Sequence, residues 1–142
     1  MSEPELDDWT KGLIADMRAH GGRPSQGWGA GKTFLILTSK GAKSGKDRIA
    51  ITTYHKDGNH WVIAASKGGS DEHPGWYWNL KANPDTTIEV DNEQVPVHAT
   101  IEASGPERDR LWADHVAQLP EIGDYPSKAS RVIPMIVLER AG

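Results

Sequence analysis

Short apolar segments separated by glycine-rich and polar turns fill the chain from Thr33 onward. They are rich in β-branched residues and have the length of single strands, which is typical of an antiparallel sheet. We expect strands at 33–39, 49–55, 61–65, 86–90, 94–102 and 133–139. Asp57-Gly58 is the usual signal of a tight hairpin turn, so the second strand is predicted to pair antiparallel with the third. Pro96 in the fifth strand predicts an edge or a bulge.

Two other segments show the spacing of amphipathic helices. Within 4–20, apolar residues recur on one face before Gly21-Gly22 ends the pattern, namely Leu6, Trp9, Leu13, Ile14 and Met17. The opposite face is mainly acidic, the wrong sign for an anionic membrane, so we expect this helix to pack on the body of the protein or to cover a pocket. A capping box of Ser104 and Glu107 predicts a second helix that ends at Gln118.

These elements predict a mainly β (α+β) fold. We expect a split β-barrel of about six antiparallel strands, because closure removes the exposed edges that such short strands would otherwise leave. An N-terminal helix, a short aromatic helix and one helix before the last strand complete it. We divide the chain into residues 1–32, an amphipathic helix with a glycine-rich connector, and residues 33–142, the barrel that binds the cofactor.

Composition narrows the class of protein. The chain has 142 residues, a formal net charge of -4 and no cysteine. This length suits one core, and the acidic balance disfavours a general nucleic-acid-binding surface. Without cysteine there are no disulfides or thiolate sites, and the absence of a long apolar run argues against a membrane anchor. We therefore expect a cytoplasmic protein.

One loop reverses the acidic balance. The segment 40–48, KGAKSGKDR, carries Lys40, Lys43, Lys46 and Arg48 against Asp47 alone. Two glycines among the basic residues allow backbone N–H groups to face an anion, which favours a polyanion site over a solvated hairpin.

The stretch 61–84 has the pattern of a strand, a polar glycine turn and an aromatic helix. The strand ends in small residues, which let a flat ligand approach its backbone, and Ser66-Lys67-Gly68-Gly69 offers an anion or carbonyl cradle. Pro74 opens a short helix, whose adjacent Trp76, Tyr77 and Trp78 cannot all point inward.

The predicted hairpin brings these two stretches together. If 49–55 pairs with 61–65, Arg48 and Ser66 lie at the same end of the hairpin, so the basic loop adjoins the Ser-Lys-Gly-Gly turn. His55 and His60 flank the turn at the opposite end. With no third ligand nearby, we expect no metal site there, and we expect His115 to be structural.

The strings SKxxKSGxxR at 39–48, ASKGGSDEHPGWYWNLKANP at 65–84 and IPMIVLE at 133–139 resemble the deazaflavin-dependent nitroreductase family. The resemblance implies a split β-barrel that binds coenzyme F420 and reduces quinones, nitroaromatics or similar small organic acceptors. It also implies cofactor contacts from Lys43, Ser44, Gly45, Arg48, Ala64, Ser66, Lys67, Gly68, Trp76 and Asn79. Tyr125 matches a substrate-facing tyrosine and, with Ser66, is a candidate proton donor.

The residues themselves fit this cofactor, a flat ring with a long anionic tail, because a basic loop lies beside an aromatic, glycine-lined stretch. Three alternatives remain: an oxidoreductase that uses flavin mononucleotide, a non-catalytic carrier of F420 or another flat anion, and a single-strand nucleic-acid barrel, which the acidity ranks last. The expected partner is a small electron acceptor, with no nucleic acid and no membrane anchor, and the chain is expected to be a monomer or a homodimer.

Overall fold

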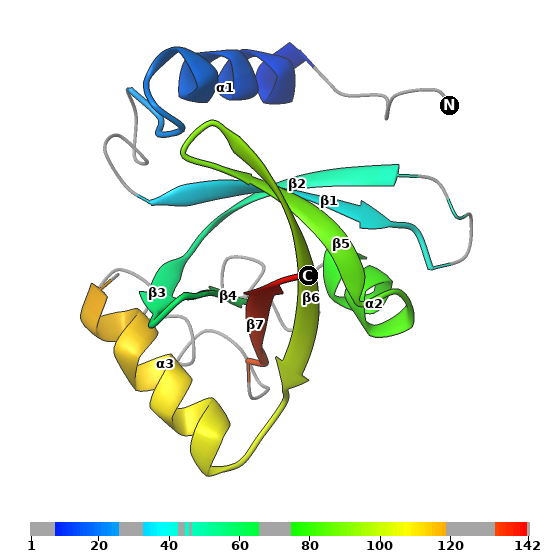
Figure 1. Ribbon diagram of the computed structural model, residues 1–142, viewed down its shortest axis with the longest axis vertical. Helices are drawn as coiled ribbons and strands as arrows, with labels where there is room; N and C mark the ends of the chain where they lie inside the picture. Colours follow the sequence, from blue (N-terminus) through cyan, green and yellow to red (C-terminus); the bar gives the residue numbers. More distant parts are fainter. Residues whose placement is uncertain are drawn as a thin grey trace.

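The computed structural model describes residues 8–25, 33–42, 45, 47–65, 75–118 and 133–141. These residues form one curled sheet with helices on its outside and at one end (Figure 1). The helices are α1 (Asp8–Ala19), α2 (Gly75–Ala82) and α3 (Pro106–Gln118). The strands are β1 (Phe34–Lys40), β2 (Asp47–Thr53), β3 (His55–Asp57), β4 (His60–Ala64), β5 (Asp85–Val90), β6 (Glu93–Glu102) and β7 (Met135–Arg140).

The strand order explains why the sheet curls. All neighbours are antiparallel, in the order β2-β1-β5-β6-β7-β4-β3, so β2 and β3 form the two edges. Only Tyr54 separates these edges along the chain. It is fixed to the start of β1, because its N–H donates to the Thr33 carbonyl (3.1 Å) and its carbonyl accepts from Thr33 Oγ1 (2.7 Å). The two edges must therefore approach each other, and the sheet becomes barrel-like.

The strand pairing corrects one prediction. The segment 49–55 was expected to pair with 61–65, but β2 pairs with β1 over seven residue pairs, and only β3 pairs with β4. The expected Asp-Gly turn is present between β3 and β4, and Gly58 has a φ of +61°. The chain bends at Tyr54. The run that resembles one strand is therefore two strands, β2 and β3, which form the two opposite edges of the sheet. This division gives seven strands among the described residues instead of about six.

Two local predictions were also wrong. Strand β6 is not an edge, because it lies between β5 and β7, and Pro96 is accommodated near the end of β7, where its carbonyl accepts from the Ala141 N–H. In α3 the first helical hydrogen bond is accepted by the Gly105 carbonyl from Asp109. The Glu107 carboxylate binds Arg110 in place of the predicted capping box with Ser104.

Alternation along the strands divides the apolar residues between the interior and the outer face. Leu35 and Leu37 of β1 and Ile63 of β4 belong to the cluster that fills the barrel. Their neighbours point outward: Ile36 packs under α1, and Val62 packs under α3. Because the side chains of a strand alternate, β1, β4 and β7 each contribute to two clusters, and the helices cover their outer faces.

Helix α1 packs on the barrel, as one of the two sequence-based options predicted. Ile14 and Met17 are buried against Ile36. At its C-terminal end, Arg18 makes two hydrogen bonds of 2.9 Å to the carboxylate of Glu89, and the Asn92 side chain donates to the Arg18 carbonyl. A paired carboxylate and a capped helix end thus fix α1 to the β5–β6 hairpin.

We predict that Gly22→Ala weakens this attachment more than Gly21→Ala does. Both glycines have positive φ, at +95° and +71°, so alanine at either position costs about 1–2 kcal/mol of backbone strain. Only at Gly22 would the new Cβ lie 2.8 Å from the Asp91 Cα, whereas Gly21 has open space. Urea unfolding of both variants tests this, and equal loss of stability would contradict the close approach.

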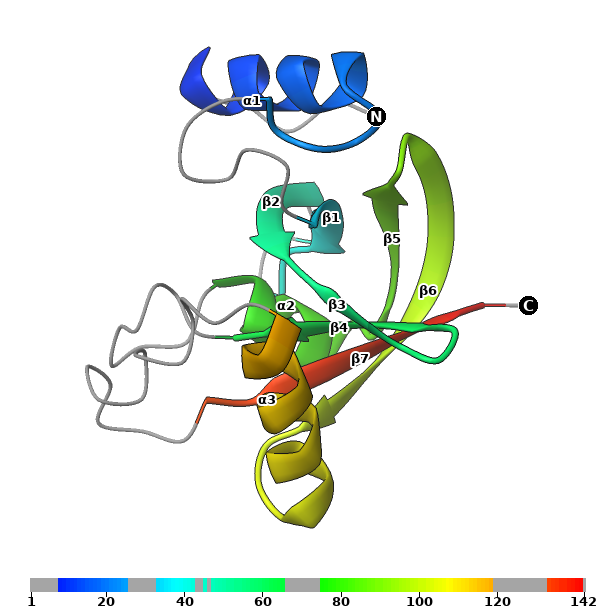
Figure 2. The same cartoon turned by 90° about the vertical axis from the view of Figure 1, so that its left-hand side faces the viewer.

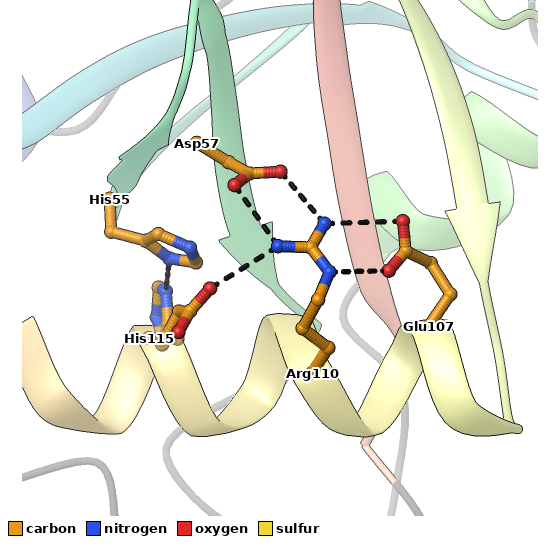
Figure 3. A network of polar contacts seen from close by, with 6 residues as sticks. His55, Asp57, Glu107, Arg110 and His115 are labelled. Atoms are coloured by element: carbon orange, nitrogen blue, oxygen red, sulfur yellow. Dashed lines mark hydrogen bonds and ion pairs between the residues drawn. The ribbon is translucent and has the colours of Figure 1, made fainter.

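Helix α3 is joined to β3 by a polar network (Figure 3). Arg110 binds Asp57 through two hydrogen bonds of 2.9 and 3.1 Å, and it also contacts Glu107 and Asp114 of its own helix. The Arg110 hydrogen bond holds the pKa of Asp57 below its usual value. The network is largely exposed, so it orients the helix more than it stabilises the fold.

Beside this network lies a buried pair of histidines. Nδ1 of His55 lies 2.7 Å from Nδ1 of His115, and both rings are buried (Figure 3). One ring must donate and the other accept, because two N–H groups cannot share this contact. Neither Nε2 atom has a partner within the described part of the chain. Burial lowers the pKa of His55 and lowers the pKa of His115 to about 3, with His55 contributing to the second shift.

We predict that this pair makes the protein less stable as the pH falls below about 6.5, the pKa of an unfolded histidine. Between pH 6.5 and 5 His115 stays neutral in the folded state while the unfolded chain takes up protons. The unfolded state then binds more protons, so the free energy of unfolding decreases with falling pH, by up to about 1.4 kcal/mol per pH unit for His115, and the lowered pKa of His55 acts in the same direction. Denaturant titrations at several pH values measure this slope.

The matched variants are His115→Gln and His60→Gln. His60 is partly exposed, with its Nε2 3.5 Å from Glu139, so it lies outside the buried pair and serves as the control. The loss of His115 should make the slope shallower even if the variant is less stable overall. A slope that is the same in all three proteins would rule out the buried pair as its source.

Candidate active site

The end of the β1–β2 hairpin holds the described part of the basic loop. The Gly45 N–H donates to the Gly41 carbonyl at 3.0 Å, and Gly45 has a φ of +70°. This left-handed conformation suits glycine and closes the turn. Lys43, Ser44 and Lys46 lie outside the described residues. Arg48 is exposed near the start of β2, and it has no carboxylate within ion-pair distance among the described residues.

Asn79 of α2 ties this loop to the barrel. Its Oδ1 accepts a hydrogen bond from the Ala42 N–H at 3.0 Å, and its Nδ2 donates to Ser39 Oγ at 3.1 Å. Ser39 is buried and pairs with Arg48 across the hairpin. A single side chain therefore positions both the loop backbone and the strand residue opposite Arg48. The sequence suggested Asn79 as a cofactor contact, but nothing local to it indicated these bonds.

The two faces of the hairpin differ in charge. Lys40 lies opposite Asp47 in the strand register, one position further along than Ser39 and Arg48. Because side chains alternate along a strand, Lys40 and Asp47 lie on the face opposite to that of Arg48. There they line a hollow of about 380 Å³ with Asp85 and the chain that joins α2 to β5. Two carboxylates against one lysine make that hollow unsuited to an anionic ligand. The face of Arg48 is the cationic one.

Helix α2 closes the same end of the barrel. Tyr77 and Leu80 are buried in the interior cluster, Trp76 packs partly against it, and Trp78 is 49% exposed. The prediction that the three rings cannot all point inward is thus confirmed. Trp76 and Asn79 are three residues apart and share a helix face.

The end of β4 reaches this region too. Ala65 lies in the interior cluster with Tyr77, and its N–H donates to the Pro134 carbonyl at 3.0 Å. Ala64 points the other way, into the cluster under α3, so a ligand at this strand could meet it only through its backbone. The structure links Asn79 to the loop of Gly45 and to Ser39, the cross-strand partner of Arg48. Four candidate residues of the turn and the C-terminal loop, Ser66, Lys67, Gly68 and Tyr125, lie outside the described residues.

The histidines that flank the β3–β4 turn do not share a site. His55 contacts His115, and His60 contacts Glu139. Within the described ranges no three metal-binding side chains come together. No described helix is both long and apolar enough to cross a membrane.

Comparison with known proteins identifies the family. Residues 9–140 match the family described as F420H(2)-dependent quinone reductase. An F420H(2)-dependent quinone reductase of Mycobacterium tuberculosis is 41% identical over 108 residues, which cover 75% of this chain and 72% of that relative.

Solved structures agree with this assignment. An F420-H2-dependent reductase superposes with a TM-score of 0.67 at 34% identity, covering 75% of this chain and 93% of the other. A structure described as a domain-swapped dimer gives a TM-score of 0.70 at 29% identity, covering 93% of this chain and 98% of the other.

The chain belongs to the F420H(2)-dependent quinone reductase family. This membership confirms the split-barrel fold, the oxidoreductase class and coenzyme F420 as the cofactor, all of which the sequence motifs led us to expect. It favours F420 over flavin mononucleotide.

We predict that Asn79→Ala releases the basic loop. The Ala42 amide loses its acceptor, so its hydrogen exchange should accelerate about 3- to 10-fold, as expected for one hydrogen bond. Amide exchange followed by NMR measures this, with Lys81→Ala on the exposed side of the same helix as control. Equal exchange in both variants would show that Asn79 does not hold the loop.

Proposed function

We propose that the protein reduces a quinone with a hydride from reduced F420, bound at the barrel end formed by the basic loop, α2 and the end of β4. The observation that carries this assignment is the exposed Arg48, which lies opposite Ser39, the residue that Asn79 binds together with the loop backbone. Family membership supplies the reaction class.

The residues fit the two parts of the cofactor. F420 has a flat ring and a tail of phosphodiester and carboxylate groups. The face of Arg48 suits the tail, since guanidinium groups bind such anions through charge-assisted hydrogen bonds, while the acidic hollow on the other face does not. The half-buried ring of Trp76 suits the flat part. We propose that Lys43, Ser44 and Gly45 assist at the tail, and that Ala64, Ser66, Lys67 and Gly68 lie along the ring.

When it is bound, the cofactor supplies the hydride from its own ring carbon, so the chain itself needs no redox group. The chain orients the ring against the acceptor, excludes water and provides a proton to the reduced acceptor oxygen. We propose Tyr125 as the donor of this proton, because a phenol remains protonated at neutral pH. Ser66 is the second candidate.

Assembly and location are also proposals. One similar structure is described as a domain-swapped dimer, which supports a homodimer as one of two states, monomer or homodimer, for this chain. We further propose a cytoplasmic location, based on the cysteine-free composition. The division into residues 1–32 and 33–142 remains a proposal as well.

The test of this function is a titration of F420 followed by assay of hydride transfer to a quinone. We predict that Arg48→Ala weakens F420 binding by about 1–3 kcal/mol, the range for a lost charge-assisted hydrogen bond, and that added salt weakens binding to the parent. Lys11→Ala on the exposed side of α1 removes the same charge far from the site and should bind normally.

Two outcomes would contradict the proposal. If Arg48→Ala and Lys11→Ala bind F420 equally well, the tail does not lie on the Arg48 face. If F420 binds but no quinone is reduced, the chain is a carrier of the cofactor. Turnover of Tyr125→Phe and Ser66→Ala at saturating F420 then decides between the two proton donors, since only the true donor should lose turnover without losing affinity.

A further inference from the structure

A second hollow lies at the barrel end opposite the candidate active site. Because the strands are antiparallel, the start of β1, the start of β4 and the end of β7 meet at one end, whereas the end of β1 and the end of β4 meet at the other. The first of these ends holds a hollow of about 400 Å³. Its lining includes residues of β3 and β4, which lie on the left in Figure 1, and Figure 2 views the molecule from that side. Its volume is within the range of small-molecule sites.

Aromatic residues form the apolar wall of this hollow. Trp61 and Tyr54 line it together with Val90, and all three belong to the cluster that fills the barrel. The hollow is therefore the open end of the interior, and its wall is held in place by the packing of the whole core. A planar ligand would meet a rigid surface there.

Three cations surround the same space. Arg23, Lys56 and Arg140 line the hollow with two carboxylates, Asp91 and Glu93. Lys56 Nζ lies 4.4 Å from the centre of the Trp61 ring, and the Arg140 guanidinium lies 5.6 Å from it. The ring attracts both cations, Lys56 from β3 and Arg140 from β7, the two strands that flank β4.

The carboxylates do not neutralise this group. Glu93 lies 3.6 Å from Arg140, in an exposed pair that is worth little. Neither Arg23 nor Lys56 has a carboxylate within ion-pair distance among the described residues. Asp91 acts instead on Tyr54: burial raises the pKa of this phenol, Asp91 raises it further and Arg23 opposes the rise. Tyr54 thus keeps its proton and can donate a hydrogen bond to an anion.

We propose that this hollow binds a small aromatic carboxylate, with its ring against Tyr54 and Val90 and its acid group on Lys56. Both features follow from the lining. An inorganic anion would leave the aromatic wall unused, and a neutral ring would leave Arg23 and Lys56 without an anionic partner among the described residues. The site is separate from the F420 site and does not depend on it.

The experiment uses 4-fluorobenzoate as the probe, followed by fluorine NMR, with inorganic phosphate as a second arm. We expect saturable binding of the benzoate in the parent and a loss of about 5- to 150-fold in affinity for Lys56→Gln, the size of one charge-assisted hydrogen bond. Lys56→Arg keeps the charge and should bind. Lys81 lies 5.6 Å from the Trp78 ring, outside the hollow, so Lys81→Gln is the matched control and should bind as the parent does.

Three results would overturn the proposal: no saturable binding of the benzoate, equal affinity in Lys56→Gln and Lys81→Gln, or phosphate binding as tightly as the benzoate. If Lys56→Gln is poorly folded, the comparison of Lys56→Arg with Arg140→Gln takes its place. Because the hollow lies at the opposite end, F420 affinity should be unchanged by the benzoate. Failure here would therefore leave the F420 titration unaffected.

Discussion

The fold depends on one constraint: the chain passes from one edge of the sheet to the other through a single residue. Tyr54 follows β2 and precedes β3, so the two edges cannot separate, and its backbone is fixed to Thr33 at the start of β1. The sheet must curl around whatever lies between those edges. What lies there is a packed apolar cluster, so the interior is filled and ligands are restricted to the two ends.

The two ends are completed in different ways. At one end α2 contributes Tyr77 and Leu80 to the core and uses Asn79 to hold the loop of the β1–β2 hairpin. The helix therefore closes the barrel and positions a cationic segment at the same time. At the other end the aromatic wall remains open to the hollow beside Trp61. A rigid barrel closed at one end by α2 suits a cofactor that carries out the chemistry itself and needs the protein mainly to hold it in a fixed orientation.

Much of this arrangement could be predicted from the sequence, and the failures have a common cause. Runs of β-branched residues predicted most strand positions, because alternation and turn residues are local signals. The break at Tyr54 has no local signal: no glycine or proline stands between Arg48 and Asp57. The bend results from competition between two distant partners, β1 and β4. The hydrogen bonds of Asn79 to Ala42 and Ser39 likewise have no local signal in the sequence, because their partners lie more than thirty residues away.

The charge distribution links the fold to the choice of ligands. A chain with a net charge of -4 repels anions at long range, so binding an anionic cofactor requires cations gathered locally and protected from neighbouring acids. Strand alternation achieves this at the β1–β2 hairpin, where Asp47 and Arg48 point to opposite faces. In a helix two neighbouring residues would lie only about 100° apart around the axis, and an irregular loop would not fix their separation. The β-hairpin thus gives a short mixed sequence one cationic face and one face on which Asp47 offsets Lys40 and Asp85 of β5 adds a further negative charge.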